Sequence, residues 1–139
     1  MSGDWLIYTV ISCLLYGLWG FFSKLTTNYI QPQSALVYQG IGITLVGIFV
    51  FCQSGFQLQV GKVGIVSAIV GGILAMLASL FYLVALSKGK VAMVVTLTGL
   101  YPLVSILLAF FILKEPITLR QGFSILLALG AIVLFSWGE

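Results

Sequence analysis

The chain has 139 residues, of which 61% are hydrophobic and only 6% are charged, and its net charge is +3 at pH 7. Soluble domains carry about 25% charged residues, so this composition excludes a soluble globular domain and predicts side chains that face lipid or other helices. Six scattered basic residues exclude an extended phosphate-binding surface, and we expect no nucleic-acid partner.

Five apolar segments follow one another along the chain, separated by short polar or glycine-containing connections. Segments of roughly 17–25 residues suit a hydrocarbon core about 30 Å thick, and backbone groups in lipid must bond within each segment. The predicted transmembrane helices cover about residues 5–25, 34–52, 63–86, 91–113 and 121–137. We therefore expect an all-α membrane protein, a five-helix bundle forming a single domain over 1–139, which crosses the inner cell membrane several times.

The first predicted helix carries Tyr16, Trp19 and Lys24 in its second half. We expect a retained helix rather than a signal peptide, because the segment has neither a basic leader nor a small-residue cleavage site. Tyr16, Trp19 and Ser23 lie along one side, and Tyr16 and Trp19 are candidates for substrate binding. Lys24 has two interpretations: its ammonium group reaches the lipid headgroups, or it attracts an anionic group of a substrate.

Gln39 and Tyr82 are the candidate binding residues of the second and third predicted helices. Gln39 lies about a turn and a half into its helix, and Tyr82 either belongs to the interfacial aromatic belt or lines a pocket. Small residues recur at every fourth position of the third helix, at Ser67, Gly71, Ala75 and Ser79. Such a stripe favours close packing of helices rather than a ligand site.

The fourth predicted helix contains Pro102 near its middle. Proline has no N–H, so the carbonyl of Thr98 loses its helical partner and a kink is expected. Thr98, Tyr101 and Ser105 form a polar stripe on the same face. They either hydrogen-bond to neighbouring helices around the kink or line a cavity and contact the substrate.

The acids of the sequence are Asp4, Glu115 and Glu139, and there is no His. This set gives no carboxylate pair, no metal site and no base beside a nucleophile, so we expect neither an enzyme nor a cofactor. Glu115 lies in the turn before the last predicted helix, where a carboxylate can accept from the free N–H groups of the helix start. We interpret Glu115 as a structural acid.

The basic residues divide evenly between the two sides of the membrane. With five spans, the N-terminal side receives Lys62, Lys114 and Arg120, and the other side receives Lys24, Lys88 and Lys90. Orientation normally follows an excess of Lys and Arg on the cytoplasmic side, so equal counts predict insertion in both orientations and an antiparallel homodimer. The alternative is that the terminal amine, Asp4 or a partner fixes one orientation.

Three parts of the chain resemble the EamA-like drug/metabolite transporter superfamily. They are the first-helix stretch 16–24, the turn 85–90, and the proline-bearing stretch 100–103 with the acidic turn and following glycine of 113–122. The resemblance implies a five-helix unit equivalent to one half of an inverted-repeat transporter. The related small multidrug resistance proteins carry a Glu in the first helix; this sequence has no acid there, which argues against their proton-coupled cation export.

Together these observations predict a transporter, in the exporting direction, of small metabolites or drugs. It would work by alternating access as an antiparallel homodimer, with a site between the first, third and fourth helices of both copies, surrounded by membrane lipids. A second hypothesis is a subunit of a lipid-linked carrier flippase or an accessory membrane complex, since Lys24 and the basic turn 88–90 suit anionic headgroups. A third is a structural membrane protein.

Overall fold

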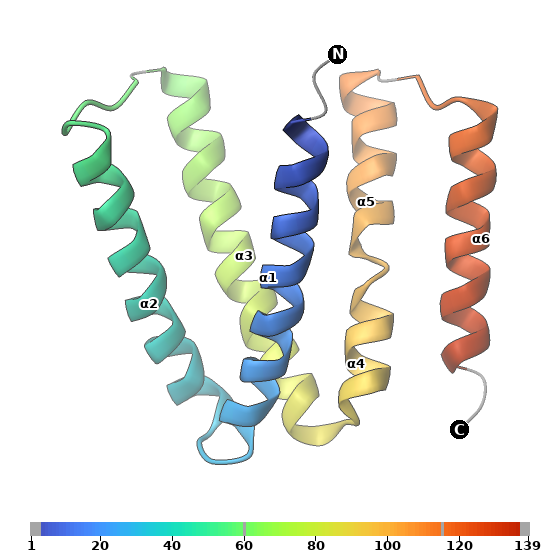
Figure 1. The fold of residues 1–139 in the computed structure, drawn as a ribbon, viewed down its shortest axis with the longest axis horizontal. Coiled ribbons are helices and arrows are strands. Elements are labelled where there is room, and N and C mark those ends of the chain that lie inside the picture. The colour runs from blue at the N-terminus through green and yellow to red at the C-terminus, as the bar shows by residue number, and fades with distance from the viewer. Residues whose placement is uncertain (1–3, 60, 115, 137–139) are drawn as a thin grey trace. The chain divides into compact units, whose positions relative to one another are not determined.

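The computed structural model describes residues 4–59, 61–114 and 116–136, and it consists of helices joined by short turns (Figure 1). Four spans in these residues are long and apolar enough to cross a membrane, namely Trp5–Thr27, Pro32–Gln53, Lys62–Lys88 and Val91–Leu113. A shorter apolar helix covers Leu119–Phe135. The protein is therefore an all-α membrane protein, as predicted.

The chain forms two compact units, Met1–Lys88 and Gly89–Glu139. A single transmembrane domain over 1–139 stays a prediction. Glu115 lies outside the described residues, so its role as a structural acid stays a prediction as well.

The first unit is built on three helices that run alternately up and down (Figure 1). They are α1 (Asp4–Thr27), α2 (Pro32–Gln53) and α3 (Lys62–Lys88), and each contacts the other two. Pro32 begins α2 at a position where its missing N–H is not needed. The chain leaves α2 through Gly55 and Phe56, both at positive φ (65° and 61°), so the backbone reverses direction there.

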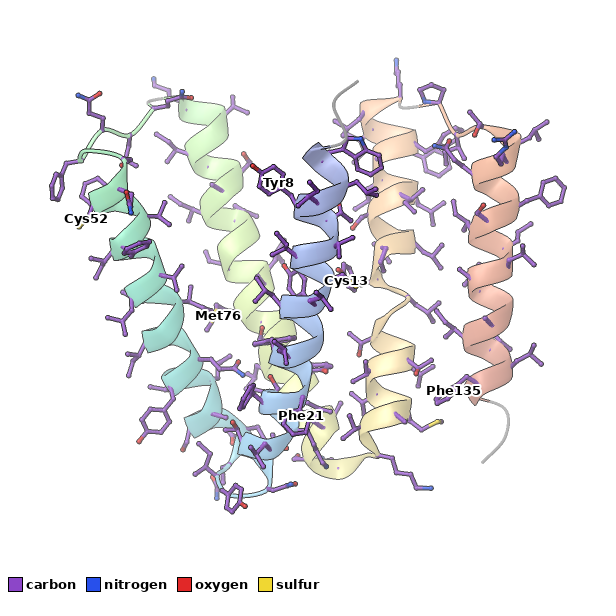
Figure 2. The ribbon with its side chains drawn as sticks, in the orientation of Figure 1. Tyr8, Cys13, Phe21, Cys52, Met76 and Phe135 are labelled. Carbon is purple, nitrogen blue, oxygen red and sulfur yellow. The ribbon has the colours of Figure 1, made fainter. Side chains whose placement is uncertain are left out.

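Burial in this unit is concentrated at one end of the three helices. The buried side chains are Ser23, Ala35, Leu83 and Leu86. Because the helices alternate in direction, the last turns of α1 and α3 and the first turn of α2 meet at this end. Elsewhere apolar side chains project outward (Figure 2), and Tyr8, Cys13 and Cys52 are exposed. An apolar outer surface suits contact with lipid or with other helices.

The second unit contains the interrupted fourth span and the last helix. Its elements are α4 (Val91–Thr98), α5 (Tyr101–Leu108), the π-helical turn η1 (Ala109–Leu113) and α6 (Leu119–Ser136), and α4 contacts α6. The turn η1 ends at Lys114, which has the left-handed φ of 55°. This conformation closes the span before the chain turns toward α6.

Pro102 interrupts the fourth span, which was expected as one kinked helix over about 91–113. The structure divides it at Gly99 and Leu100, visible as a gap in the coil between α4 and α5 (Figure 1). The Leu100 N–H donates to the Leu97 carbonyl at 3.1 Å, which forms a tight turn. Pro102 then falls in the first turn of α5, where proline fits without losing a hydrogen bond. The proline therefore restarts the helix rather than bending it.

The start of α6 is held by a capping box formed by Thr118 and Gln121. The Thr118 N–H and hydroxyl each donate to the Gln121 Oε1 at 2.9 Å, and the Gln121 N–H lies 3.4 Å from the Thr118 Oγ1. Such reciprocal bonds satisfy backbone donors that the helix itself leaves unpaired.

Thr118→Ala is expected to destabilise the protein by about 1 kcal/mol, because it removes the hydroxyl from the capping box. Thr118→Ser keeps the hydroxyl and should stay near the wild type. Thermal unfolding in detergent measures both variants. Equal loss from Ala and Ser would show that the cap does not stabilise α6.

Candidate functional site

Two aromatic rings meet between α1 and α3 in the first unit. Trp19 and Tyr82 stack with ring centroids 5.1 Å apart and an interplanar angle of 16°. Trp19 remains 38% exposed and Tyr82 is half-buried, so part of the stack is accessible. The glycine beside Trp19 lets Tyr82 approach α1 closely, because a Cβ on Gly20 would lie only 3.1 Å from the Tyr82 hydroxyl.

A polar pair joins α1 to α2 at the buried end of this unit. The Gln39 Nε2 donates to the Ser23 Oγ at 3.1 Å, and Ser23 is only 1% exposed. Interhelical bonds of this kind average about 0.6 kcal/mol in a membrane protein. Their main effect here is positional, since they fix the Gln39 amide one turn along α1 from Trp19.

Lys24 joins α1 to α3 at the same end. Its Nζ donates to the Leu86 carbonyl at 2.7 Å, and the side chain is half-buried. The last carbonyls of a helix lack partners within the helix, and a cation there also interacts favourably with the helix dipole. Lys24 therefore reaches across to the end of α3, an arrangement that neither sequence interpretation included.

Five of the residues named so far come together, and Tyr16 does not join them by any described bond or ring contact. Trp19, Ser23 and Lys24 of α1 face Gln39 of α2 and Tyr82 of α3. Tyr16 lies one turn before Trp19 and is 65% exposed. We call the group Trp19, Ser23, Lys24, Gln39 and Tyr82 the α1 cluster.

The polar stripe of the fourth span lies at its interruption. Thr98 is the last residue of α4 and Tyr101 the first of α5, so the two flank the break, and Ser105 follows one turn later. All three are exposed, with Tyr101 at 62%. Polar side chains beside a broken helix are positioned to contact a solute or a second helix.

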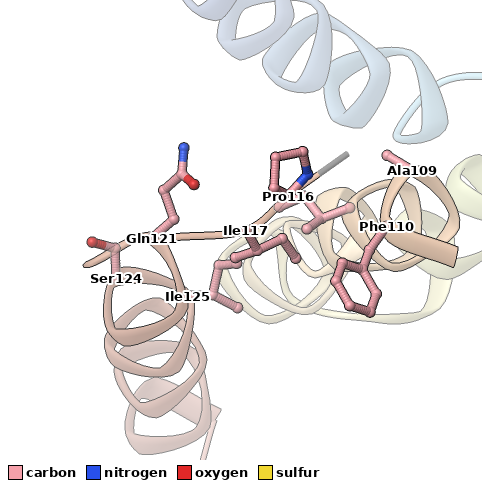
Figure 3. Close-up of a pocket in the computed structure, with 8 residues that line it drawn as sticks. Ala109, Phe110, Pro116, Ile117, Gln121, Ser124 and Ile125 are labelled. Atoms are coloured by element: carbon pink, nitrogen blue, oxygen red, sulfur yellow. The ribbon is translucent and has the colours of Figure 1, made fainter. Parts of the chain in front are cut away.

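The second unit also contains an open hollow of about 340 Å³ at the turn between η1 and α6 (Figure 3). It is lined by Ile106, Ala109, Phe110, Pro116, Ile117, Gln121, Ser124 and Ile125. None of the predicted binding residues lines it, and the Gln121 oxygen already accepts in the capping box. The hollow is apolar and wide open, so we do not assign the solute site to it.

The sequence of this helical membrane protein has counterparts among known proteins. Residues 3–137 match the EamA-like transporter family. The chain belongs to this family. The resemblance found in the sequence is thereby confirmed, and EamA membership identifies a membrane transporter of the drug/metabolite class.

This EamA protein is also similar to a protein of Methanocaldococcus jannaschii described as uncharacterized. The two are 29% identical over 131 residues, which cover 94% of this chain and 95% of that protein. No solved structure matches the chain.

The sequence analysis of this EamA protein placed Ser23 on the same side of the first helix as Trp19 but did not name it among the binding residues. The structure shows that Ser23 is the acceptor for Gln39. The Leu86 carbonyl, which holds Lys24, is a backbone group and has no signature in the sequence.

Proposed function

We propose that this protein exports small amphipathic or aromatic solutes by alternating access, as an antiparallel homodimer in the inner cell membrane. The observation that carries the proposal is the α1 cluster, in which a partly exposed aromatic stack lies beside an amide, a hydroxyl and an ammonium group. A few polar groups among aromatic and apolar side chains are typical of small-molecule sites.

The homodimer is supported by the charges of the connections. Three basic residues fall on each side of the five-span arrangement, so side-chain charge favours neither orientation. Two oppositely oriented copies would reproduce the inverted repeats from which many transporters are built. In such an assembly each copy contributes its α1 cluster and its polar stripe of Thr98, Tyr101 and Ser105.

The break in the fourth span supports alternating access. Discontinuous helices near the membrane midplane frequently form the solute sites of transporters, because the unwound backbone offers hydrogen-bonding groups. The turn at Gly99 and Leu100 also divides the span into two rigid pieces that can change their mutual angle. We propose that Glu115, in contrast, has a structural role and does not carry protons.

The proposal predicts separate effects for the polar stripe and for a neighbouring apolar residue. Tyr101→Ala and Thr98→Val should each lower solute export about tenfold, because they remove groups that contact the solute, whereas insertion and protein yield stay near normal. Leu107→Ala is the matched control, since Leu107 is also exposed on α5 but lies off the stripe. Export from cells, normalised to the amount of protein in the membrane, measures the difference.

Equal losses from all three variants, in proportion to protein abundance, would show that the stripe only packs against other helices. Co-purification of a lipid-linked carrier with no export of soluble solutes would instead favour the flippase-subunit hypothesis.

A further inference from the structure

The aromatic stack and the Lys24 ammonium group lie along one seam between α1 and α3. Gly20 and Lys24 are four residues apart on α1, and their respective neighbours on α3, Tyr82 and Leu86, are four residues apart as well. Residues at this spacing lie on one helix face about 5–6 Å apart. The Tyr82 side of the aromatic stack therefore lies about one helical turn from the contact between Lys24 and Leu86.

The charged residues around this seam favour an anionic ligand over a cationic one. Asp4 is the only acid in the sequence from Met1 to Lys88, and it begins α1. Lys24 lies twenty positions later, which is about 30 Å along a helix. A cationic solute on the stack would meet the Lys24 ammonium and no carboxylate from this unit, whereas an anionic solute would meet an opposite charge. Because the Lys24 side chain is half-buried, water screens this difference less than on an open surface.

Lys24 can exchange one of its present partners for a ligand. Its Nζ now donates to the neutral Leu86 carbonyl. Hydrogen bonds between two ionised groups are shorter and about twice as strong as neutral ones. The lysine side chain has four flexible carbons and three donors, so the ammonium group can turn toward a carboxylate along the seam.

We propose that the α1–α3 seam is a binding site for aromatic anions, with the ring against the exposed part of Trp19 and the anionic group on the Lys24 ammonium. The inference rests on the proposed transport function, to which it adds the substrate class. Attraction of cations to the Trp19 ring acts in the opposite direction, and we expect the repulsion from Lys24 to outweigh it. The expected order of affinity is anion, then neutral molecule, then cation.

Three probes that share one ring test this order in the purified full-length protein. Indole-3-acetate is an anion at pH 7, indole-3-ethanol is neutral and tryptamine is a cation. Equilibrium dialysis in detergent should show indole-3-acetate binding about tenfold more tightly than indole-3-ethanol, as expected for one charge-assisted hydrogen bond, and tryptamine binding most weakly. Equal affinities, tightest binding of tryptamine, or no saturable binding of any probe would overturn the proposal.

Variants then assign the two halves of the site. Lys24→Met should lower the affinity for indole-3-acetate to that for indole-3-ethanol, and Lys24→Arg should retain the preference for the anion. Trp19→Leu should lower the affinity for all three probes. Trp5→Leu is its matched control, being the same substitution on α1 at an exposed tryptophan outside the α1 cluster. A preference for the anion that survives in Lys24→Met would contradict the assignment.

The same probes separate this inference from the transport function. If the three probes bind in the expected order but none is transported in proteoliposomes, the binding site is supported and the transport function is wrong. If the protein transports other solutes but neither binds indole-3-acetate nor is inhibited by it, the transport function stands and the aromatic-anion site is wrong.

Discussion

Gly20→Val is expected to lower solute transport about tenfold or more, because it displaces the Tyr82 ring that stacks on Trp19, and small misplacements in a binding site have large effects. The Cβ alone would lie 3.1 Å from the Tyr82 hydroxyl, and valine adds two methyl groups to it. Tyr82 must then move, which opens its stack with Trp19. Transport by purified protein in proteoliposomes measures the loss.

Gly17→Val is the matched control. Gly17 lies one turn earlier on the same helix, and a Cβ there meets no atom within 4 Å. The two substitutions have the same intrinsic effect on helix formation, so the contact with Tyr82 distinguishes them. Equal losses from Gly17→Val and Gly20→Val would show that the seam is not the site.

A double variant examines the same contact from the other side. Gly20→Ala should reduce transport modestly, since the tyrosine must shift by only a few tenths of an ångström. Adding Tyr82→Phe removes the hydroxyl that the new methyl group approaches and should restore part of the activity.

Two arginines added after Glu139 are expected to convert a mixed orientation into one with the C-terminus inside. With three basic residues on each side, the unmodified chain should show its C-terminus on both sides in roughly comparable amounts, and two extra positive charges should shift about nine tenths of the molecules. C-terminal fusions to alkaline phosphatase, active outside, and to a fluorescent protein that matures inside measure the two populations.

Two glutamines added at the same place are the control, because they lengthen the chain without adding charge. Transport should also fall in the arginine variant, since antiparallel dimers need both orientations. A single location for the unmodified chain would show that the orientation is fixed, and the antiparallel homodimer would then be wrong.

Much of the fold was predictable because lipid imposes simple rules. Each span must be a helix of sufficient length, so hydropathy alone located the helical segments. Pro102 indicated that the fourth helix is irregular, but the sequence did not distinguish a kinked helix from two helices, the second of which begins at Tyr101. That outcome depends on the tight turn at Gly99 and Leu100, in which Leu100 bonds to Leu97. The capping box was predictable from Thr118 and Gln121, a Thr and a Gln three residues apart, but the sequence analysis considered only Glu115 at the start of this helix.

The grouping of the α1 cluster was only partly predictable because its contacts join distant segments. Trp19, Gln39 and Tyr82 were found from residue type and position, since polar and aromatic groups in lipid need a reason to be there. The bond of Lys24 to the Leu86 carbonyl was not, because it joins residues 62 positions apart and one partner is backbone. Gly20 belongs to the same class: its importance follows from the distance to the Tyr82 hydroxyl, which only the packing of α1 on α3 defines.

The most direct test of the transport function is solute counterflow in liposomes that contain this purified protein alone. Vesicles are loaded with an unlabelled aromatic solute that raises the melting temperature of the protein, and uptake of the same labelled solute is followed over time. We expect transient accumulation above the level of protein-free liposomes, retained in Trp5→Leu and lost in Trp19→Leu. Uptake equal to that of protein-free liposomes, or accumulation that Trp19→Leu leaves unchanged, would contradict transport through the α1 cluster.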